Sequence, residues 1–406
     1  MNDTFAASRP HRQLPGPVAL IVLLGGLSAF GPLSLDTYLP GLPDLQEDFH
    51  TSTTLAQLTL SFCLLGLASG QIFAGSLSDR FGRQRPLRYG LALYAIASIL
   101  CAVAPSIWAL LLFRYIQGVA GGAGVVIARA KVRDLHDGAE AARFFSRLML
   151  VSGLAPILAP IFGGQLLRFM DWRGIFVVLG IIGLILLLAT SLFLPETLPH
   201  DRRLSGGFRQ TASTFGSLIS DRVFLGYILT MGCAGAALFG YIASSPFVLQ
   251  KIHGLSEQQF SLVFGTIAAG FIISSQINGR LVGKIPLQTL LHRGLSAFAV
   301  CGGLLLVVTL LDLPLPAFLV PLYAMMWTMG FIFPNSTALA LTNYPRSAGS
   351  ASALLGLAQF ATGAIAAPLV GIAGEESALP MALVISFSST CALLAFLRLS
   401  RHIVTH

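Results

Sequence analysis

Gly75-Ser76-Leu77-Ser78-Asp79-Arg80-Phe81-Gly82-Arg83-Gln84-Arg85 is a short charged turn between two long apolar segments. Glycine permits the close backbone approach and the tight turn that such a connection needs. Asp79 can accept hydrogen bonds from a helix N-terminus or pair with an arginine across a domain interface. We therefore predict a conformational latch made of Gly75, Asp79, Arg80, Gly82 and Arg83. The alternative is a basic loop that serves only to orient the chain.

The composition of the chain is that of a polytopic membrane protein. Of its 406 residues, 55% are hydrophobic and only 10% are charged, whereas a soluble domain carries about a quarter charged residues. The apolar runs are continuous over about 20 residues, as a transmembrane helix requires, whereas barrel strands alternate over about 10. We therefore predict an all-α membrane protein.

Twelve transmembrane helices can be drawn, with approximate limits 17–39, 54–75, 86–104, 107–128, 142–168, 173–194, 222–249, 257–279, 286–311, 315–342, 347–371 and 379–399. Lysine and arginine gather in alternate connections and at both ends of the chain, which predicts cytoplasmic termini. The net charge of +8 then follows from membrane topology, and no nucleic-acid partner is expected.

One long polar connection, from Pro195 to Asp221, divides the twelve segments into two sets of six. The turn after the second segment resembles the one after the eighth, Gly279-Arg280-Leu281-Val282-Gly283-Lys284. We predict an N-terminal six-helix bundle (1–198), a cytoplasmic linker (199–220) and a C-terminal six-helix bundle (221–406). Two related halves of this kind indicate a transporter whose site lies between them.

Two ionisable residues lie within apolar segments. Asp36 is the only such group in the first segment, and Arg114 is the only basic one deep in the fourth. A charge in hydrocarbon costs roughly 2.5–3.5 kcal/mol on insertion scales, so it is retained for a function or a partner. Arginine keeps its charge and provides a fixed field against which a carboxyl group titrates. We predict that Asp36 and Arg114 couple transport to protons; the alternatives are an inert helix-ending cap and a snorkelling arginine.

Other polar and aromatic residues within apolar segments are candidates for binding a substrate: Tyr38, Gln57, Gln117, Tyr241, Trp327 and Asn335. The fifth segment is rich in small residues and proline. Small residues let helices pack closely and prolines bend them. Packing without a role in transport remains an alternative for that segment.

These motifs resemble those of the major facilitator superfamily. The turn Gly75–Arg85 is similar to its loop 2–3 motif, and Arg114-Tyr115-Ile116-Gln117-Gly118 is similar to its R-x-x-Q-G pattern. In the fifth segment, Pro156, Pro160, Gly163 and Gly164 resemble the antiporter motif G-P-x-x-G-G, with Ala159 in place of the glycine before the second proline. The resemblance implies a major facilitator fold with 12 transmembrane helices in two pseudo-symmetric six-helix bundles.

A narrower resemblance covers nearly the whole chain. Asp36-x-Tyr38-Leu39-Pro40-x-Leu42-Pro43, Pro195-Glu196-Thr197-Leu198 and Ser245-Pro246-Phe247 are similar to the Bcr/CflA drug-resistance subfamily of bicyclomycin and chloramphenicol exporters. This resemblance implies a proton-coupled multidrug antiporter of the bacterial cytoplasmic (inner) membrane, working by alternating access. Composition and spacing alone indicate only a transporter.

No enzyme signature is evident, because the sequence has no HExxH, Walker or GxSxG motif in a suitable setting. The five cysteines are scattered through apolar segments, so we expect no metal site and no disulfide framework. We expect no cofactor, a proton gradient as the energy source, and a monomer in the lipid bilayer. The alternatives are a proton-coupled importer or facilitator of a small nutrient, and a membrane-embedded enzyme or sensor.

Overall fold

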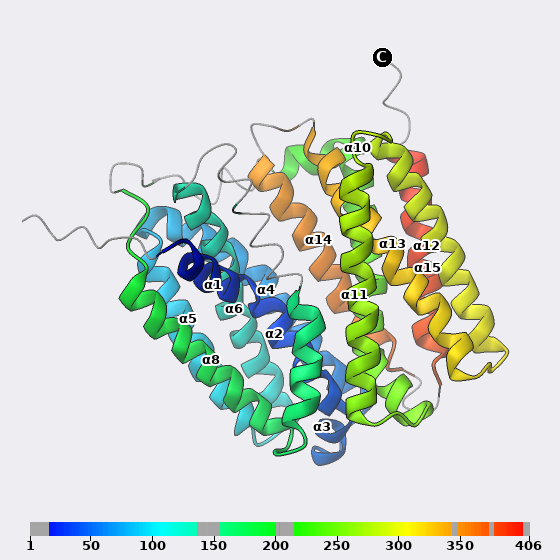
Figure 1. Ribbon diagram of the computed structural model, residues 1–406, viewed down its shortest axis with the longest axis horizontal. Helices are drawn as coiled ribbons and strands as arrows, with labels where there is room; N and C mark the ends of the chain where they lie inside the picture. The colour runs from blue at the N-terminus through cyan, green and yellow to red at the C-terminus, as the bar shows by residue number, and fades with distance from the viewer. Residues whose placement is uncertain are drawn as a thin grey trace, which may run out of the picture.

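The computed structural model describes residues 16–135, 144, 154–199, 203, 215–342, 344, 348–372 and 377–400. Its helices form two bundles that lie side by side, one in blue to green and one in yellow-green to red (Figure 1). Within the described residues the predicted linker 199–220 is represented only by its ends and Arg203. The domain boundaries therefore stay a prediction.

The first bundle contains α1 (Pro17–Ser28), α2 (Phe30–Asp36), η1 (Leu39–Gly41), α3 (Leu42–Asp48), α4 (Thr53–Phe81), α5 (Gln84–Ala102), α6 (Ile107–Leu135), the helix Leu154–Leu166 and α8 (Trp172–Phe193). The second contains α10 (Arg222–Pro246), η3 (Phe247–Ile252), α11 (Glu257–Leu281), α12 (Leu287–Leu310), α13 (Leu315–Thr342), α14 (Ala348–Leu369), α15 (Leu379–Ala395) and η5 (Phe396–Ser400).

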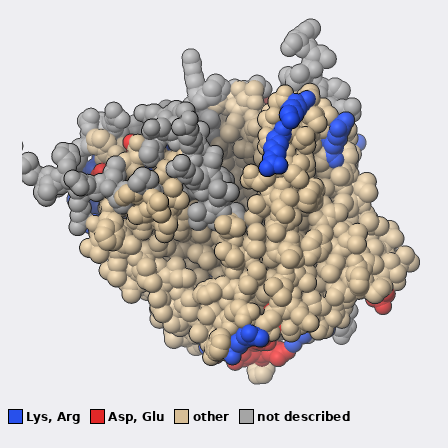
Figure 2. Space-filling view, in the orientation of Figure 1, with Lys and Arg blue, Asp and Glu red and all other residues tan. Residues whose placement is uncertain are grey.

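The helices have the length and composition of membrane spans. Among the described residues, nine are long and apolar enough to cross a bilayer, and a tenth span results if the bent pair Val18–Ser28 and Phe30–Asp48 counts as one. The other two predicted spans correspond to α5 and to the shorter helix Leu154–Leu166. On the face drawn in Figure 2, charged side chains lie towards two ends and a broad uncharged band separates them.

The first span differs from its prediction as one straight helix. Its two parts meet at an angle of 47°. Pro32 lies within α2, four residues after the end of α1 at Ser28. A proline cannot donate to the carbonyl four residues earlier and its ring clashes with that carbonyl, so the helix bends there.

Glycines bring α4 and α6 into backbone contact. A Cβ atom on Gly66 would lie 2.3 Å from the carbonyl oxygen of Tyr115, and one on Gly118 would lie 2.2 Å from that of Cys63. No side chain fits at such distances, so these positions require glycine. The two helices therefore form one rigid pair.

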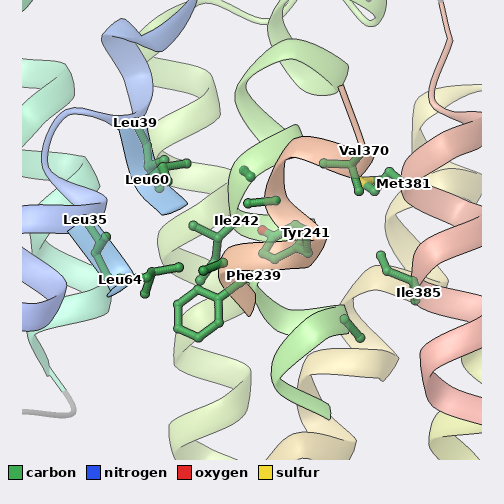
Figure 3. Close-up of a cluster of buried hydrophobic side chains, with 14 of the residues drawn as sticks. Leu35, Leu39, Leu60, Leu64, Phe239, Tyr241, Ile242, Val370, Met381 and Ile385 are labelled. Carbon is green, nitrogen blue, oxygen red and sulfur yellow. The ribbon is translucent and has the colours of Figure 1, made fainter. Parts of the chain in front are cut away.

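A hydrophobic seam joins the two bundles. Leu35 and Leu39 near the end of the first span, with Leu60 and Leu64 of α4, lie on one side of the cluster; Phe239, Tyr241, Ile242, Val370, Met381 and Ile385 of the second bundle lie on the other (Figure 3). These side chains are buried. The seam holds the bundles together next to α2, which carries Asp36.

Polar contacts between the bundles lie at the end that carries α3, η3 and the start of α4 and α11, which we call the closed end (the lower end of Figure 1). The Gln57 amide donates to the Ala243 carbonyl at 3.1 Å, and the Gln250 amide donates to the Pro40 carbonyl at 3.0 Å. Lys251 forms an ion pair with Glu47. We call the opposite end the open end; the surface is hollowed there between the bundles (Figure 2).

Candidate functional site

Arg114 lies in the middle of the first bundle and has no accessible surface. Its Nε donates to the Thr59 carbonyl at 3.3 Å, and Nη1 donates to Gln117 Oε1 at 2.6 Å. The guanidinium carbon lies 4.4 Å from the centre of the Tyr38 ring and 5.4 Å from that of Phe176. Aromatic faces and carbonyl groups thus solvate the charge in place of water.

A chain of hydrogen bonds extends from this arginine to neighbouring helices. The Gln117 amide donates to Ser98 Oγ of α5 at 2.7 Å. The Tyr38 hydroxyl is 2.8 Å from Thr59 Oγ1, which donates to the Ala56 carbonyl. Gln117 and Tyr38, both predicted to bind substrate, therefore lie beside Arg114 and help to position it.

Asp36 is not brought into an ion pair with Arg114. Its residue is 5% exposed, and within the described part of the chain its carboxylate has no hydrogen bond or ion pair. Arg114 likewise has no carboxylate partner there, and its Nη2 has no hydrogen-bond acceptor. The predicted direct contact is therefore absent in this conformation, because the Tyr38 ring lies over the guanidinium. The coupling role of both residues stays a prediction.

The group that Asp36 interacts with electrostatically belongs to the other bundle. The hydroxyl of Tyr241, on α10, feels the charge of Asp36. This hydroxyl is fully buried and has no hydrogen-bond partner. Its ring is stacked on Phe264 of α11, with centroids 5.5 Å apart and an interplanar angle of 10°. Tyr241 thus lies beside the seam that must part if the bundles separate (Figure 3).

The other predicted substrate residues have different surroundings. Gln57 lies in the closed-end contact, where its Oε1 has no partner. Asn335 of α13 exchanges two hydrogen bonds with Asn278 of α11, at 3.2 and 2.8 Å, so its amide is used in joining these helices. Trp327 is 40% exposed on α13.

The turn Gly75–Arg85 forms a polar network at the open end of the first bundle. Arg83 donates to Asp79, to Ser78 Oγ at 2.8 Å and to Asp134 Oδ2 of α6 at 2.9 Å. Gly82, with φ of +87°, turns the chain so that Arg83 folds back over the end of α4. Asp79 was expected to pair with an arginine across the domain interface; it instead pairs within the turn.

The remaining members of the predicted latch contribute less to this network. The Arg80 guanidinium lies over the Phe81 ring, 5.2 Å from its centre. Gly75 faces α6, where an added Cβ would lie 3.8 Å from Val126. The latch function stays a prediction, because the structure records one arrangement of the turn.

Glu196 is a member of this network whose role the sequence did not predict. Its carboxylate accepts hydrogen bonds from the backbone N–H groups of Arg83 at 2.8 Å and Gln84 at 3.0 Å, at the N-terminus of α5. Lys131, fully buried, donates to Gln84 Oε1 and to the Pro195 carbonyl. Burial raises the pKa of Glu196, but these N–H groups, that of Leu198 and the charge of Lys131 outweigh burial and place the pKa below its ordinary value.

Small residues of the helix Leu154–Leu166 permit close contacts at the closed end. A Cβ on Gly163 would lie 1.7 Å from the Thr37 carbonyl oxygen, and one on Gly164 would lie 2.3 Å from Ser261 Oγ of α11. The helix runs through Pro156 and Pro160 without a break. This segment therefore packs against both bundles.

No group of three or more His, Cys, Asp or Glu side chains that could hold a metal ion occurs in the described ranges. Hydroxyls that sequence reasoning missed, Thr59 and Ser98, complete the surroundings of Arg114. Ordinary Ser and Thr residues within apolar segments carry no sequence signal that would single them out.

Comparisons with known proteins agree on the family. A family model described as Major Facilitator Superfamily matches residues 20–368. An uncharacterized MFS-type transporter YdgK of Bacillus subtilis (strain 168) is 40% identical over 95% of this chain and 96% of its own. A bicyclomycin resistance protein homolog of Haemophilus influenzae is 30% identical over 93% and 94%, and a multidrug resistance protein MdtL of Shigella dysenteriae is 28% identical over 81% and 82%.

Solved structures share the fold at low sequence identity. A bacterial homolog of the human lysosomal transporter Spinster, in an inward-facing and occupied conformation, matches with a TM-score of 0.74 and 16% identity over 96% of this chain and 97% of its own. The xylose transporter XylE from E. coli, in a partially occluded inward-open conformation, matches with a TM-score of 0.70 and 16% identity over 95% and 97%.

Proposed function

The chain belongs to the Major Facilitator Superfamily, and from this premise we propose that it is a proton-coupled antiporter that exports small drugs, like bicyclomycin and chloramphenicol, across the bacterial inner membrane. The family and the transporter neighbours make it a multi-pass membrane transporter and not an enzyme. Two relatives named for drug resistance support the direction of transport and the class of substrate.

The observation that carries the coupling proposal is the buried carboxyl group of Asp36. It lies beside the seam without a hydrogen bond or ion pair to any described residue, and an unpaired carboxylate is too costly to keep there without a function. Arg114, held in one position by its neighbours, supplies a constant positive field in the same bundle. A proton bound to Asp36 changes the charge of the site without a cofactor.

Alternating access gives this charge change an effect on transport. The bundles meet at the closed end and the surface is hollowed at the open end. The excess of lysine and arginine in the connections of the open end supports a cytoplasmic position for that end and for both termini. Drug enters from the cytoplasm, the bundles rock about the site, and protons entering from outside drive the return. A monomer contains all of these parts.

Transport by Asp36→Asn tests the proposal. Everted membrane vesicles containing the wild type should accumulate drug when a pH gradient is imposed, and the variant should lose this while remaining folded. Asp312→Asn is the matched control, since Asp312 is exposed in a turn with φ of 48° that asparagine tolerates. Normal proton-driven export by Asp36→Asn would refute the coupling role. Uptake of a nutrient into right-side-out vesicles, without export, would identify an importer instead.

A further inference from the structure

The closed end contains a pair of carboxyl groups that transport through Asp36 does not use. Asp44, on α3 of the first bundle, and Glu257, the first residue of α11 in the second, lie within hydrogen-bonding reach of each other. Asp44 is exposed and Glu257 is partly buried, so both can exchange protons with solvent. The contact exists only while the two bundles touch at this end.

A proton is needed for this contact to be favourable. Two ionised carboxylates at such a distance repel each other, and neither can donate a hydrogen bond. If one of the two is protonated, its O–H donates to the other and the repulsion disappears. The geometry itself therefore calls for a bound proton.

Neighbouring charges do not remove this requirement. Glu47 on α3 and Lys251 on η3 form an ion pair with each other across the same seam. On the helix Leu154–Leu166, the part facing Glu257 is the uncharged Gly164, and Arg168 beyond the helix end donates to Gln165. With all groups ionised, three carboxylates therefore face the single ammonium group of Lys251.

We propose that Asp44 and Glu257 share one proton and thereby form a pH-sensitive contact that holds the closed end shut. Opening this end separates the two groups and releases the proton. Acid therefore favours the closed arrangement, and neutral or basic solution favours opening. If this end faces outward, as proposed above, the acidic side of an energised membrane stabilises closure of the outer side.

The expected size follows from linkage. When one arrangement binds one more proton than the other, their ratio changes by at most about tenfold per pH unit in the range where the group titrates. The effect depends only on these two groups and on contact between the bundles. It is therefore separable from proton coupling by Asp36.

A distance measurement across the closed end tests the proposal. Spin labels at Phe169→Cys and Leu311→Cys, both exposed in turns at this end of opposite bundles, report the separation by double electron–electron resonance. The native cysteines are first replaced. Between about pH 8 and about pH 5, the population with the short distance should rise, by up to about tenfold per unit within the titration range.

Two substitutions and two controls decide the interpretation. Glu257→Gln and Asp44→Asn each supply an amide that donates without a proton, so both should show the short distance throughout and lose the pH dependence. Glu47→Gln leaves the carboxyl pair intact and should keep it, as should Asp36→Asn. A wild type without pH dependence, a Glu257→Gln variant that retains it, or its loss in Asp36→Asn would each overturn the proposal. Persistence in Asp36→Asn would support it even if that variant transported drug normally.

Discussion

Replacing Gly164 by alanine should push the closed end open. The added Cβ would lie 2.3 Å from Ser261 Oγ, 3.1 Å from Ser261 Cβ and 3.3 Å from the Glu257 carbonyl oxygen. Ser261 is buried and its Oγ donates to that same carbonyl at 2.6 Å. The side chain can avoid the methyl group only by giving up this hydrogen bond, and its Cβ would remain too close.

The cost falls on the conformation in which the bundles touch. Overpacking of this kind costs about 1–3 kcal/mol, and the lost hydrogen bond adds about 0.5–1.5 kcal/mol. Because about 1.4 kcal/mol corresponds to a factor of ten, the ratio of closed to open molecules should fall by roughly ten- to a thousandfold. The spin-label pair at Phe169 and Leu311 measures this ratio directly.

Two variants separate the wedge from a general loss of stability. Gly279→Ala, on α11 where nothing lies within 4 Å of the new methyl group, should leave the distance distribution unchanged. Ser261→Gly combined with Gly164→Ala removes the obstructing side chain and should restore closure. An unchanged distribution in Gly164→Ala, or no rescue by Ser261→Gly, would refute the reasoning.

Three further substitutions test the interior and the open end. Arg114→Lys keeps the charge but loses the fork that reaches Gln117, so proton-driven export in vesicles should fall at least about tenfold while the protein stays folded. Glu196→Gln should lower thermal stability at neutral pH by about 1 kcal/mol, since the carboxylate is partly exposed. Because its pKa lies below the ordinary value in the folded protein, this stabilisation is complete above the ordinary pKa and disappears as the pH falls through the lowered one; variant and wild type should therefore converge in acid. Asn335→Leu leaves the Asn278 amide unpaired and should lower stability by about 1–3 kcal/mol, whereas Asn278→Leu/Asn335→Leu should recover part of it, as thermal unfolding would show.

The helical architecture was predictable because a bilayer leaves few alternatives. A chain in hydrocarbon must pair its backbone groups internally, so each long apolar run reads directly as a helix. The helix ends were less predictable. α4 and α6 were expected over 54–75 and 107–128 but continue to Phe81 and Leu135, because helical hydrogen bonds do not stop where the apolar run does.

The surroundings of Arg114 could be predicted only in part. Its burial follows from its place deep in an apolar segment, but depth fixes one coordinate and leaves the direction around the helix undetermined. Asp36 and Arg114 were therefore expected to meet, whereas Tyr38 lies over the guanidinium. The role of Glu196 was equally hidden, since it caps the start of a helix more than one hundred residues earlier in the chain.

The glycine contacts between α4 and α6 give α4 the properties of a lever. Gln57 near one end of α4 contacts the opposite bundle, and the other end leads into the charged turn at Arg83. Its 29 residues span about 43 Å at 1.5 Å per residue. Clamped backbone to backbone, the rod cannot bend or slide in its middle, so each degree of tilt at one membrane surface moves the other tip by about 0.7 Å. Events on opposite sides of the bilayer are thereby mechanically synchronised without any signal passing through the aqueous interior.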